Sequence, residues 1–397
     1  MEKLAITGGP PRFSHPLHVG RPNLCDKQRL YERIDGILER RWLTNDGPVV
    51  REFEQKLAET TGVKHCITMC NATVALEIAI RALGFRGEVI VPSYTFVATA
   101  HALQWQEITP IFADIDPSSY NLDPGCLDRL ITPRTTGIIG VHVFGRPCNT
   151  QAIETIARRH GLKVMYDAAH ALGCSHENKM IGGFGECEVL SFHATKFLNS
   201  FEGGAIVTNN DELADKVRLM RNFGFAGYDH VIYLGINGKM TEVCAAMGLT
   251  SLEGIENLIR LNRENYEEYR SQLQGIPGLT LIDYSTIEKR NFHYIVLEIN
   301  DRQSPLNRDE LVEVLHAENV LARKYFWPGC HRMEPYRSLF PNAYLLLPNT
   351  ELRSAQVMVL PTSQAVSKCD IAAICDILKA ALAQATVVRR ILGRKRS

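Results

Sequence analysis

Short apolar runs of strand type alternate with longer helical patterns between His65 and Asp167. The strand-type runs favour β-branched and aromatic residues, whereas the helical stretches repeat apolar residues every three to four positions. Such alternation specifies a largely parallel sheet with helices on both faces, whose ligands sit beyond the carboxyl ends of the strands. The strand-type runs are CITMC, EVIVP, PIFADI, TTGIIGVHV and KVMYD, and the helical ones are ALEIAIRAL, ATAHALQW and AIETIARRH. We therefore predict an α/β fold.

The segments on either side of this alternation predict an arm and a second domain. GGPP and GRPN turns precede a helical pattern from Arg29 to Arg41, which indicates an ordered arm before the core. A long helical stretch, roughly Met240 to Leu273, leads to LTLID, HYIVLEI, ELVEVLHAEN and IAAICDILKAALAQA. We predict that residues 1–250 form the arm and the large domain, and that residues 251–397 form a smaller C-terminal α+β domain.

Composition excludes several classes of partner. The 397 residues are 45% hydrophobic, which suits a large core divided between two domains. Lysine plus arginine equal aspartate plus glutamate at 44 each, so we expect neither a nucleic-acid partner nor membrane binding. A terminal basic cluster is read as a solvated end, with contact to an acidic partner as the alternative. It consists of Arg389, Arg390, Arg394, Lys395 and Arg396.

Cysteine spacing and the N-terminal segment favour a reducing cytosol. None of the eleven cysteines is spaced C-x-x-C, which argues against a zinc ribbon or a disulfide framework, and we expect no metal. The start MEKLAITGGPPRFSHP lacks a basic region followed by an apolar stretch, and no apolar run reaches membrane-spanning length. We expect a cytoplasmic protein.

Two candidate site segments follow predicted strands. Asn71-Ala72-Thr73 opens a helix, where unpaired backbone N–H groups can bind a phosphate, although the same residues suit a plain helix cap. Asp167 ends the strand KVMYD, where its carboxylate could keep a pyridine nitrogen protonated. A magnesium ligand or a helix cap are the alternatives for Asp167.

Two further segments supply a lysine and an aromatic ring. Ser191, His193 and Lys196 lie between a strand and a Gly-Gly turn in VLSFHATKFLNSFEGG. A partly desolvated lysine has a lowered pKa, so its neutral amine can attack an aldehyde, whereas a lone loop lysine is usually a surface charge. Phe96 in PSYTFVAT could cover one face of an aromatic ring or pack in the core.

Taken together, these motifs resemble one family over nearly the whole chain, from the arm to the PTS at Pro361 to Ser363. Their order and spacing are similar to those of the sugar-nucleotide aminotransferases of the DegT/StrS type. That family has the fold of aspartate aminotransferase, the PLP-dependent transferase fold type I. The motifs are NAT-x-AL, PSYTFVAT, DAAHALG, SFHATK, EGGAIVT and GINGKMTE.

The resemblance implies a role for each matching residue around pyridoxal phosphate (PLP). Lys196 would carry the cofactor as a Schiff base, Asp167 would pair with the pyridine nitrogen, and Ser191 would contact the phosphate. The amine of Lys196 would then move a proton between the substrate carbon and the cofactor, while the protonated ring delocalises the negative charge. Phe96 would stack on the pyridine, and His170 would lie near the ring hydroxyl.

The phosphate site would be shared between two subunits. Ala72 and Thr73 would give backbone N–H groups to the phosphate, and Asn237 would reach the phosphate held by the other subunit of a homodimer. Many family members have Gly-Thr where this chain has Ala72-Thr73. The contact therefore requires that Ala72 avoid a positive φ angle.

Finer resemblance points to the subgroup that aminates C4 of dTDP-4-keto-6-deoxy-D-glucose. It lies in RPNLCDKQRLYERIDGILERRWLTNDGP, CNATVAL and ARKYFWPGCHRMEPYR. The implied donor is L-glutamate, and the implied products are dTDP-4-amino-4,6-dideoxy-D-glucose and 2-oxoglutarate. Tyr325 and His331 would approach the sugar, and Arg323 or Lys324 would meet the diphosphate. Packing at a strand end is the alternative for each of these four residues.

Three rivals share parts of this pattern. A PLP-dependent deoxysugar dehydratase has histidine in place of the lysine, whereas Lys196 is present here. An aminotransferase acting at C3 of a 3-keto sugar needs the same cofactor residues, so these motifs separate it poorly from a C4 enzyme. A non-catalytic regulatory member of the fold would have lost Lys196 or Asp167.

A nicotinamide enzyme would need G-x-G-x-x-G after the first strand, and none is found there.

Overall fold

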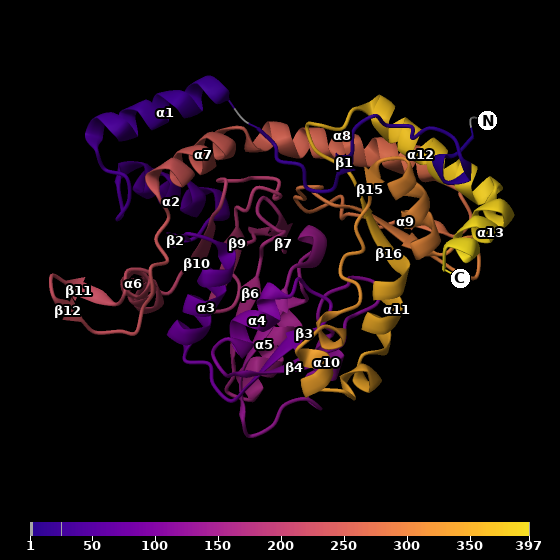
Figure 1. Cartoon of the computed structure of the whole chain (residues 1–397). Helices are drawn as coiled ribbons and strands as arrows, with labels where there is room; N and C mark the ends of the chain where they lie inside the picture. The colour runs from indigo at the N-terminus through magenta and orange to yellow at the C-terminus, as the bar shows by residue number, and fades with distance from the viewer. Residues whose placement is uncertain (1–2, 25, 397) are drawn as a thin grey trace.

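A seven-stranded sheet forms the centre of the large domain (Figure 1). The computed structural model describes residues 3–24 and 26–396. The strand order is β2-β10-β9-β6-β5-β3-β4, and within this sheet only β10 pairs antiparallel to its neighbours. The strands are β2 (His65–Met69), β3 (Glu88–Pro92), β4 (Thr109–Ala113), β5 (Thr135–Val141), β6 (Lys163–Asp167), β9 (Cys187–Ser191) and β10 (Gly204–Thr208). This mostly parallel sheet confirms the predicted α/β class.

Both faces of the sheet are buried because successive side chains of each strand enter different cores. In β10, Ile206 packs with α3, α4 and α6, whereas its neighbours Ala205 and Val207 pack with α2 and α7 on the other face. In β3, Val89 and Val91 face the first core, while Ile90 faces α5. The helices are α2 (Pro48–Thr61), α3 (Ala72–Leu83), α4 (Ala98–Gln104), α5 (Thr150–Arg159), α6 (Asp211–Met220) and α7 (Glu242–Glu253).

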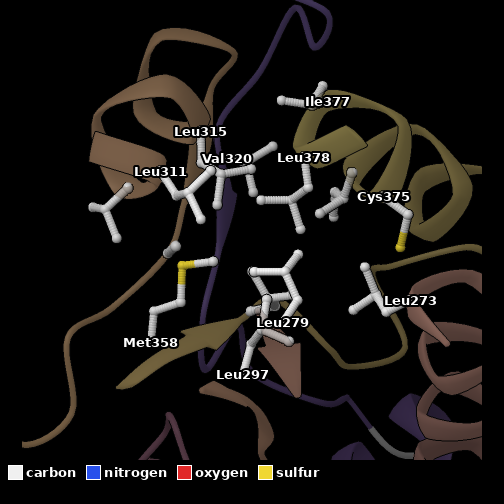
Figure 2. Packing of buried hydrophobic residues seen from close by; sticks show 14 of the residues in the cluster. Leu273, Leu279, Leu297, Leu311, Leu315, Val320, Met358, Cys375, Ile377 and Leu378 are labelled. Carbon is white, nitrogen blue, oxygen red and sulfur yellow. The ribbon is translucent and has the colours of Figure 1, made fainter. Parts of the chain in front are cut away.

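A second core lies in the C-terminal part of the chain (Figure 2). It is built on the antiparallel sheet β13-β14-β16 and includes Leu4 and Ile6 from the N-terminal arm. The arm therefore covers the small domain as well as preceding the large one, and the predicted division at residue 250 stays a prediction. The elements are α8 (Ile255–Leu273), β13 (Leu279–Leu281), β14 (Ile295–Ile299), α9 (Arg308–Ala317), β16 (Val357–Leu360), α12 (Lys368–Ala383) and α13 (Ala385–Arg396).

The long helical stretch predicted from Met240 to Leu273 is two helices. Helix α7 ends and α8 begins at Gly254, the glycine that caps both. Glycine in a helix interior costs about 1 kcal/mol relative to alanine, so a break there is inexpensive. Helix α8 then runs from the large domain toward the small one (Figure 1).

Three short elements outside these cores bear on the site and the surface. Strand β1 (Leu17–His18) of the arm pairs in parallel with β15 (Val320–Leu321). Helix α1 (Lys27–Arg40) follows the arm, and the hairpin of β11 (Phe225–Gly227) and β12 (His230–Val231) projects from the left edge of the view in Figure 1.

A helix that spans a membrane must be both long enough and apolar enough. Of the helices in residues 3–24 and 26–396, none meets both requirements by itself. Helices α12 and α13 meet them only when joined, and they are bent by 82° relative to each other.

Candidate active site

A cavity of about 300 Å³ lies at the carboxyl ends of the parallel strands. Strand β6 ends at Asp167 and β9 ends at Ser191, and both residues line the cavity. This is the edge at which a ligand is expected in a sheet of this kind. Eight of the predicted site residues line the same cavity: Ala72, Thr73, Phe96, Asp167, His170, Ser191, Lys196 and Tyr325.

One end of the cavity is the N-terminus of α3. The side chain of Asn71 accepts a hydrogen bond from the N–H of Val74 at 2.9 Å. Asn71 is therefore a helix cap, which was the alternative interpretation of this motif. The N–H groups of Ala72 and Thr73, the first two residues of the helix, have no acceptor within the helix and lie at the cavity. Gly204 of β10 lets the helix approach, because a Cβ there would lie 2.6 Å from the nitrogen of Ala72. Ala72 has a negative φ, as its predicted role requires.

Asp167 is buried and held by two hydrogen bonds. The hydroxyl of Thr99 donates to Oδ2 at 2.8 Å, and the N–H of Ala169 donates to Oδ1 at 3.1 Å. Burial raises the pKa of the carboxyl, and these two bonds act in the opposite direction. The nearby charge of Lys196 also lowers the pKa of Asp167, and a cationic ligand atom in the cavity would stabilise its charged form further.

Lys196 lies in the irregular loop between β9 and β10 and reaches the same cavity. Removal from water lowers the pKa of its ammonium from 10.5 to about 8, although the Asp167 carboxylate acts in the opposite direction. A substantial fraction of the amine is therefore neutral near physiological pH, as a nucleophilic lysine requires.

Aromatic rings border the cavity on different sides. Phe96 is 58% exposed and lines it from the loop after β3. His170 lies nearly parallel to Phe326, with ring centroids 5.8 Å apart, and its Nδ1 accepts a hydrogen bond from the N–H of Phe144 at 3.2 Å. Burial holds the pKa of His170 well below 6.5, so the ring is neutral and Nε2 carries the proton. A flat ligand would thus meet a neutral N–H donor and an aromatic face.

Comparison with known proteins places this site in a family. Residues 24–379 match the model of the DegT/DnrJ/EryC1/StrS aminotransferase family. The chain belongs to this family.

Two named transaminases and a solved structure extend the match. The dTDP-4-amino-4,6-dideoxy-D-glucose transaminase of Shigella dysenteriae is 41% identical over 321 residues, covering 81% of this chain and 87% of the relative. The Escherichia coli transaminase of the same name is 38% identical over 344 residues, covering 86% and 92%. The crystal structure of DesI in the presence of its TDP-sugar product aligns with a TM-score of 0.94 at 46% identity, over 99% of each chain. The chain is a PLP-dependent sugar aminotransferase.

The residues at the cavity of this aminotransferase fit PLP. A helix N-terminus is suited to the phosphate, the buried Asp167 to a protonated ring nitrogen, and Lys196 to the aldehyde. PLP supplies an electron sink for the carbanion formed when an amino group is transferred. The individual contacts of the predicted residues with the cofactor stay predictions.

Three of the predicted substrate residues lie outside the cavity. Arg323 is exposed, and its guanidinium lies over the ring of Tyr325, 5.1 Å from the centroid. Lys324 forms an ion pair with Asp309 at 2.5 Å. His331 is buried: its Nδ1 lies 2.6 Å from the hydroxyl of Ser93 and its Nε2 lies 2.6 Å from the Glu351 carboxylate. The contacts of His331 match the packing alternative that the sequence left open.

Asn237 also lies outside the cavity. It is exposed and forms an isolated antiparallel bridge with Asn222 beside the β11–β12 hairpin. Its predicted role in the site of a partner subunit stays a prediction.

Several residues that sequence reasoning did not single out complete the cavity wall. They come from the arm and the small domain, and they include Val19, Gly20, His293, Tyr294, Phe326 and Thr362. Phe326 and Thr362 lie in segments that carry the family resemblance, ARKYFWPGCHRMEPYR and the PTS at Pro361 to Ser363. At the cavity wall, His193 Nε2 lies 3.3 Å from a carboxylate oxygen of Glu202.

Proposed function

We propose that this family member transfers an amino group from L-glutamate to C4 of dTDP-4-keto-6-deoxy-D-glucose. The products are dTDP-4-amino-4,6-dideoxy-D-glucose and 2-oxoglutarate. The observation that carries the proposal is the alignment with DesI, a structure determined with its TDP-sugar product, over 99% of each chain. The two transaminases with this product in their name support the same substrate.

The residues at the cavity account for the proton transfers of such a reaction. Nζ of Lys196, with its lowered pKa, is a base that can take a proton from the substrate carbon and return it. The negative charge of Asp167 would keep a proton on the cofactor ring, and the hydroxyl of Thr99 holds that carboxylate in place. Because glutamate and the keto sugar would both react at the one cofactor beside Lys196, their sites would overlap and they would bind in turn.

We propose further that two copies of the chain form a homodimer with shared sites. No arginine side chain lines the cavity within the described residues, although the cofactor and both substrates are anionic. The segment 223–236, which bears the β11–β12 hairpin, exposes a group of large apolar side chains next to Asn237. A cluster of exposed large apolar side chains is typical of a protein–protein interface. The members of this group are Phe223, Phe225, Tyr228, Val231, Ile232, Tyr233, Leu234 and Ile236.

A cytoplasmic location completes the proposal. The ten cysteines among the described residues are all free, as in a reducing compartment.

The test is an NMR spectrum of dTDP-4-keto-6-deoxy-D-glucose after incubation with the enzyme, PLP and glutamate. We expect an amine-bearing carbon at C4, and we expect Lys196→Ala to give no product. Amination at C3 of a 3-keto sugar alone would overturn the position, and full turnover by Lys196→Ala would overturn the mechanism. Absence of turnover with every keto sugar would favour the regulatory alternative.

A further inference from the structure

The backbone around Lys196 is held by segments outside the central sheet. The ladder between β9 and β10 ends at the pair of Ser191 and Gly204, and the loop between them is irregular. Within this loop the N–H of Lys196 donates to the carbonyl of His193 at 2.8 Å, which closes a single turn. The position of the amine therefore depends on what packs against the loop.

Asn23 of the N-terminal arm is hydrogen-bonded to this loop. It is 3% exposed, and its Nδ2 donates to the carbonyl of Phe197, the residue after Lys196, at 3.0 Å. The side chain of Asn199 donates in return to the backbone carbonyl of Asn23 at 2.8 Å. Two reciprocal bonds thus fix the arm to the loop just after the lysine.

The same side chain also binds the small domain. Oδ1 of Asn23 accepts a hydrogen bond from the N–H of Gln364 at 3.1 Å, and the side chain of Gln364 accepts one from the N–H of Leu24 at 2.9 Å. Asn23 uses both its donor and its acceptor, so it joins three segments that are far apart in sequence.

The segments that Asn23 joins all reach the cavity. Gly20, three residues before Asn23, lines it and lies against the residue that precedes Lys196, because a Cβ on Gly20 would be 3.0 Å from Cβ of Thr195. Thr362, two residues before Gln364, lines the cavity as well. The arm therefore contacts the loop on both sides of Lys196, at Thr195 through Gly20 and at Phe197 through Asn23.

We propose that Asn23 is a positioning residue for Lys196, which clamps the arm, the lysine loop and the Thr362 segment into one wall of the active site. The inference rests on the proposed role of Lys196 as the residue that binds PLP. Reacting atoms must be aligned closely, and a displacement of about 1 Å can cost on the order of 100-fold in rate. Loss of the clamp should therefore reduce kcat more than the affinity for either substrate.

Asn23→Asp separates the two functions of the side chain. The aspartate keeps the shape and the acceptor for Gln364, but it loses the donor to Phe197 and places a negative charge beside that carbonyl. Asn199→Asp removes the reciprocal bond from the other side and serves if the Asn23 variants fold poorly. Leu24→Ala is the matched control, because its side chain is 70% exposed and its contact to Gln364 uses only the backbone.

The experiment measures kcat and KM of each variant and the visible circular dichroism of the PLP-loaded protein, which reports how firmly the bound cofactor is oriented. We expect Asn23→Asp and Asn199→Asp to lower kcat by about tenfold or more and to reduce the visible dichroism per bound PLP. Leu24→Ala should match the wild type in both.

The proposal is overturned if the Asn23 and Asn199 variants keep the wild-type kcat and dichroism, even if they melt at lower temperature, because Asn23 would then serve stability alone. A wild-type protein that shows no PLP band dependent on Lys196 would instead overturn the proposed function. The two failures are therefore distinguishable.

Discussion

The hydroxyl of Thr99 donates to Oδ2 of Asp167 at 2.8 Å, although the two residues are 68 positions apart in sequence. Thr99 is fully buried in the first turns of α4, and the hydroxyl of Thr95 lies 3.0 Å from it. Because the Thr99 proton points to the carboxylate, Thr95 can donate to Thr99 in turn. Two hydroxyl groups in series, those of Thr95 and Thr99, thus stabilise the charged form of Asp167.

We expect Thr99→Val to weaken PLP binding. The substitution conserves shape but removes a bond that lowers the pKa of Asp167, so the carboxyl becomes a weaker partner for a protonated ring nitrogen. A hydrogen bond to a charged group contributes about 1.5–3 kcal/mol, which corresponds to roughly tenfold to 100-fold in affinity. Absorbance titration of the cofactor-free protein with PLP measures this change. An unchanged affinity would show that Thr99 only fills space.

The pH dependence of cofactor capture should follow Lys196. Its ammonium pKa is lowered from 10.5 to about 8, so the neutral amine is the minor form below pH 8 and predominates above it. We expect the rate of Schiff-base formation in stopped-flow absorbance to rise by about tenfold per pH unit and then level off near pH 8. Since Asp167 raises the pKa of Lys196, Asp167→Asn should move the plateau to lower pH. A rate that still rises steeply at pH 9 would contradict the lowered pKa.

The strand ends could be predicted from sequence because local patterns determine them. Short apolar runs specify β3 and β6, and the parallel arrangement then brings Asp167, Ser191 and the start of α3 to one edge. The family resemblance supplied the roles that a pattern cannot give, such as which loop lysine enters the cavity.

The rest of the site depends on contacts between distant segments. Asn23 meets Phe197 and Gln364 across sequence separations of 174 and 341 residues, and nothing in RPNLCD marks that asparagine as buried. His331 carries the residue type of a sugar ligand, yet Ser93 and Glu351 occupy both of its ring nitrogens. Tertiary packing decides such cases, and it is not encoded in a local pattern.

His331→Ala should destabilise the fold while leaving substrate affinity nearly unchanged. The histidine is 2% exposed and joins Ser93 after β3 to Glu351 of α11 (Pro348–Gln356), so its loss removes the side-chain partner of the buried Ser93 hydroxyl and leaves it only the backbone N–H of residue 331. We expect a decrease of about 1–3 kcal/mol in the free energy of unfolding. Chemical denaturation measures that decrease, and KM for the keto sugar should change less than twofold or so. A large rise in KM with unchanged stability would instead support the predicted sugar-binding role.

Leu234→Asp should dissociate the proposed homodimer and abolish the activity that depends on it. Leu234 lies in segment 223–236 and is 69% exposed in the single chain, so a dimer interface there would bury it. An aspartate at a buried apolar contact has no partner for its charge and costs several kcal/mol.

Leu345→Asp is the matched control, because Leu345 is 65% exposed and lies between α10 (Tyr336–Leu339) and α11, in a different part of the fold (Figure 1). Sedimentation velocity should show monomer for Leu234→Asp and dimer for Leu345→Asp. If Asn237 completes the partner's phosphate site, the monomeric variant should also bind PLP more weakly. A Leu234→Asp protein that stays dimeric and fully active would show that the interface does not include segment 223–236.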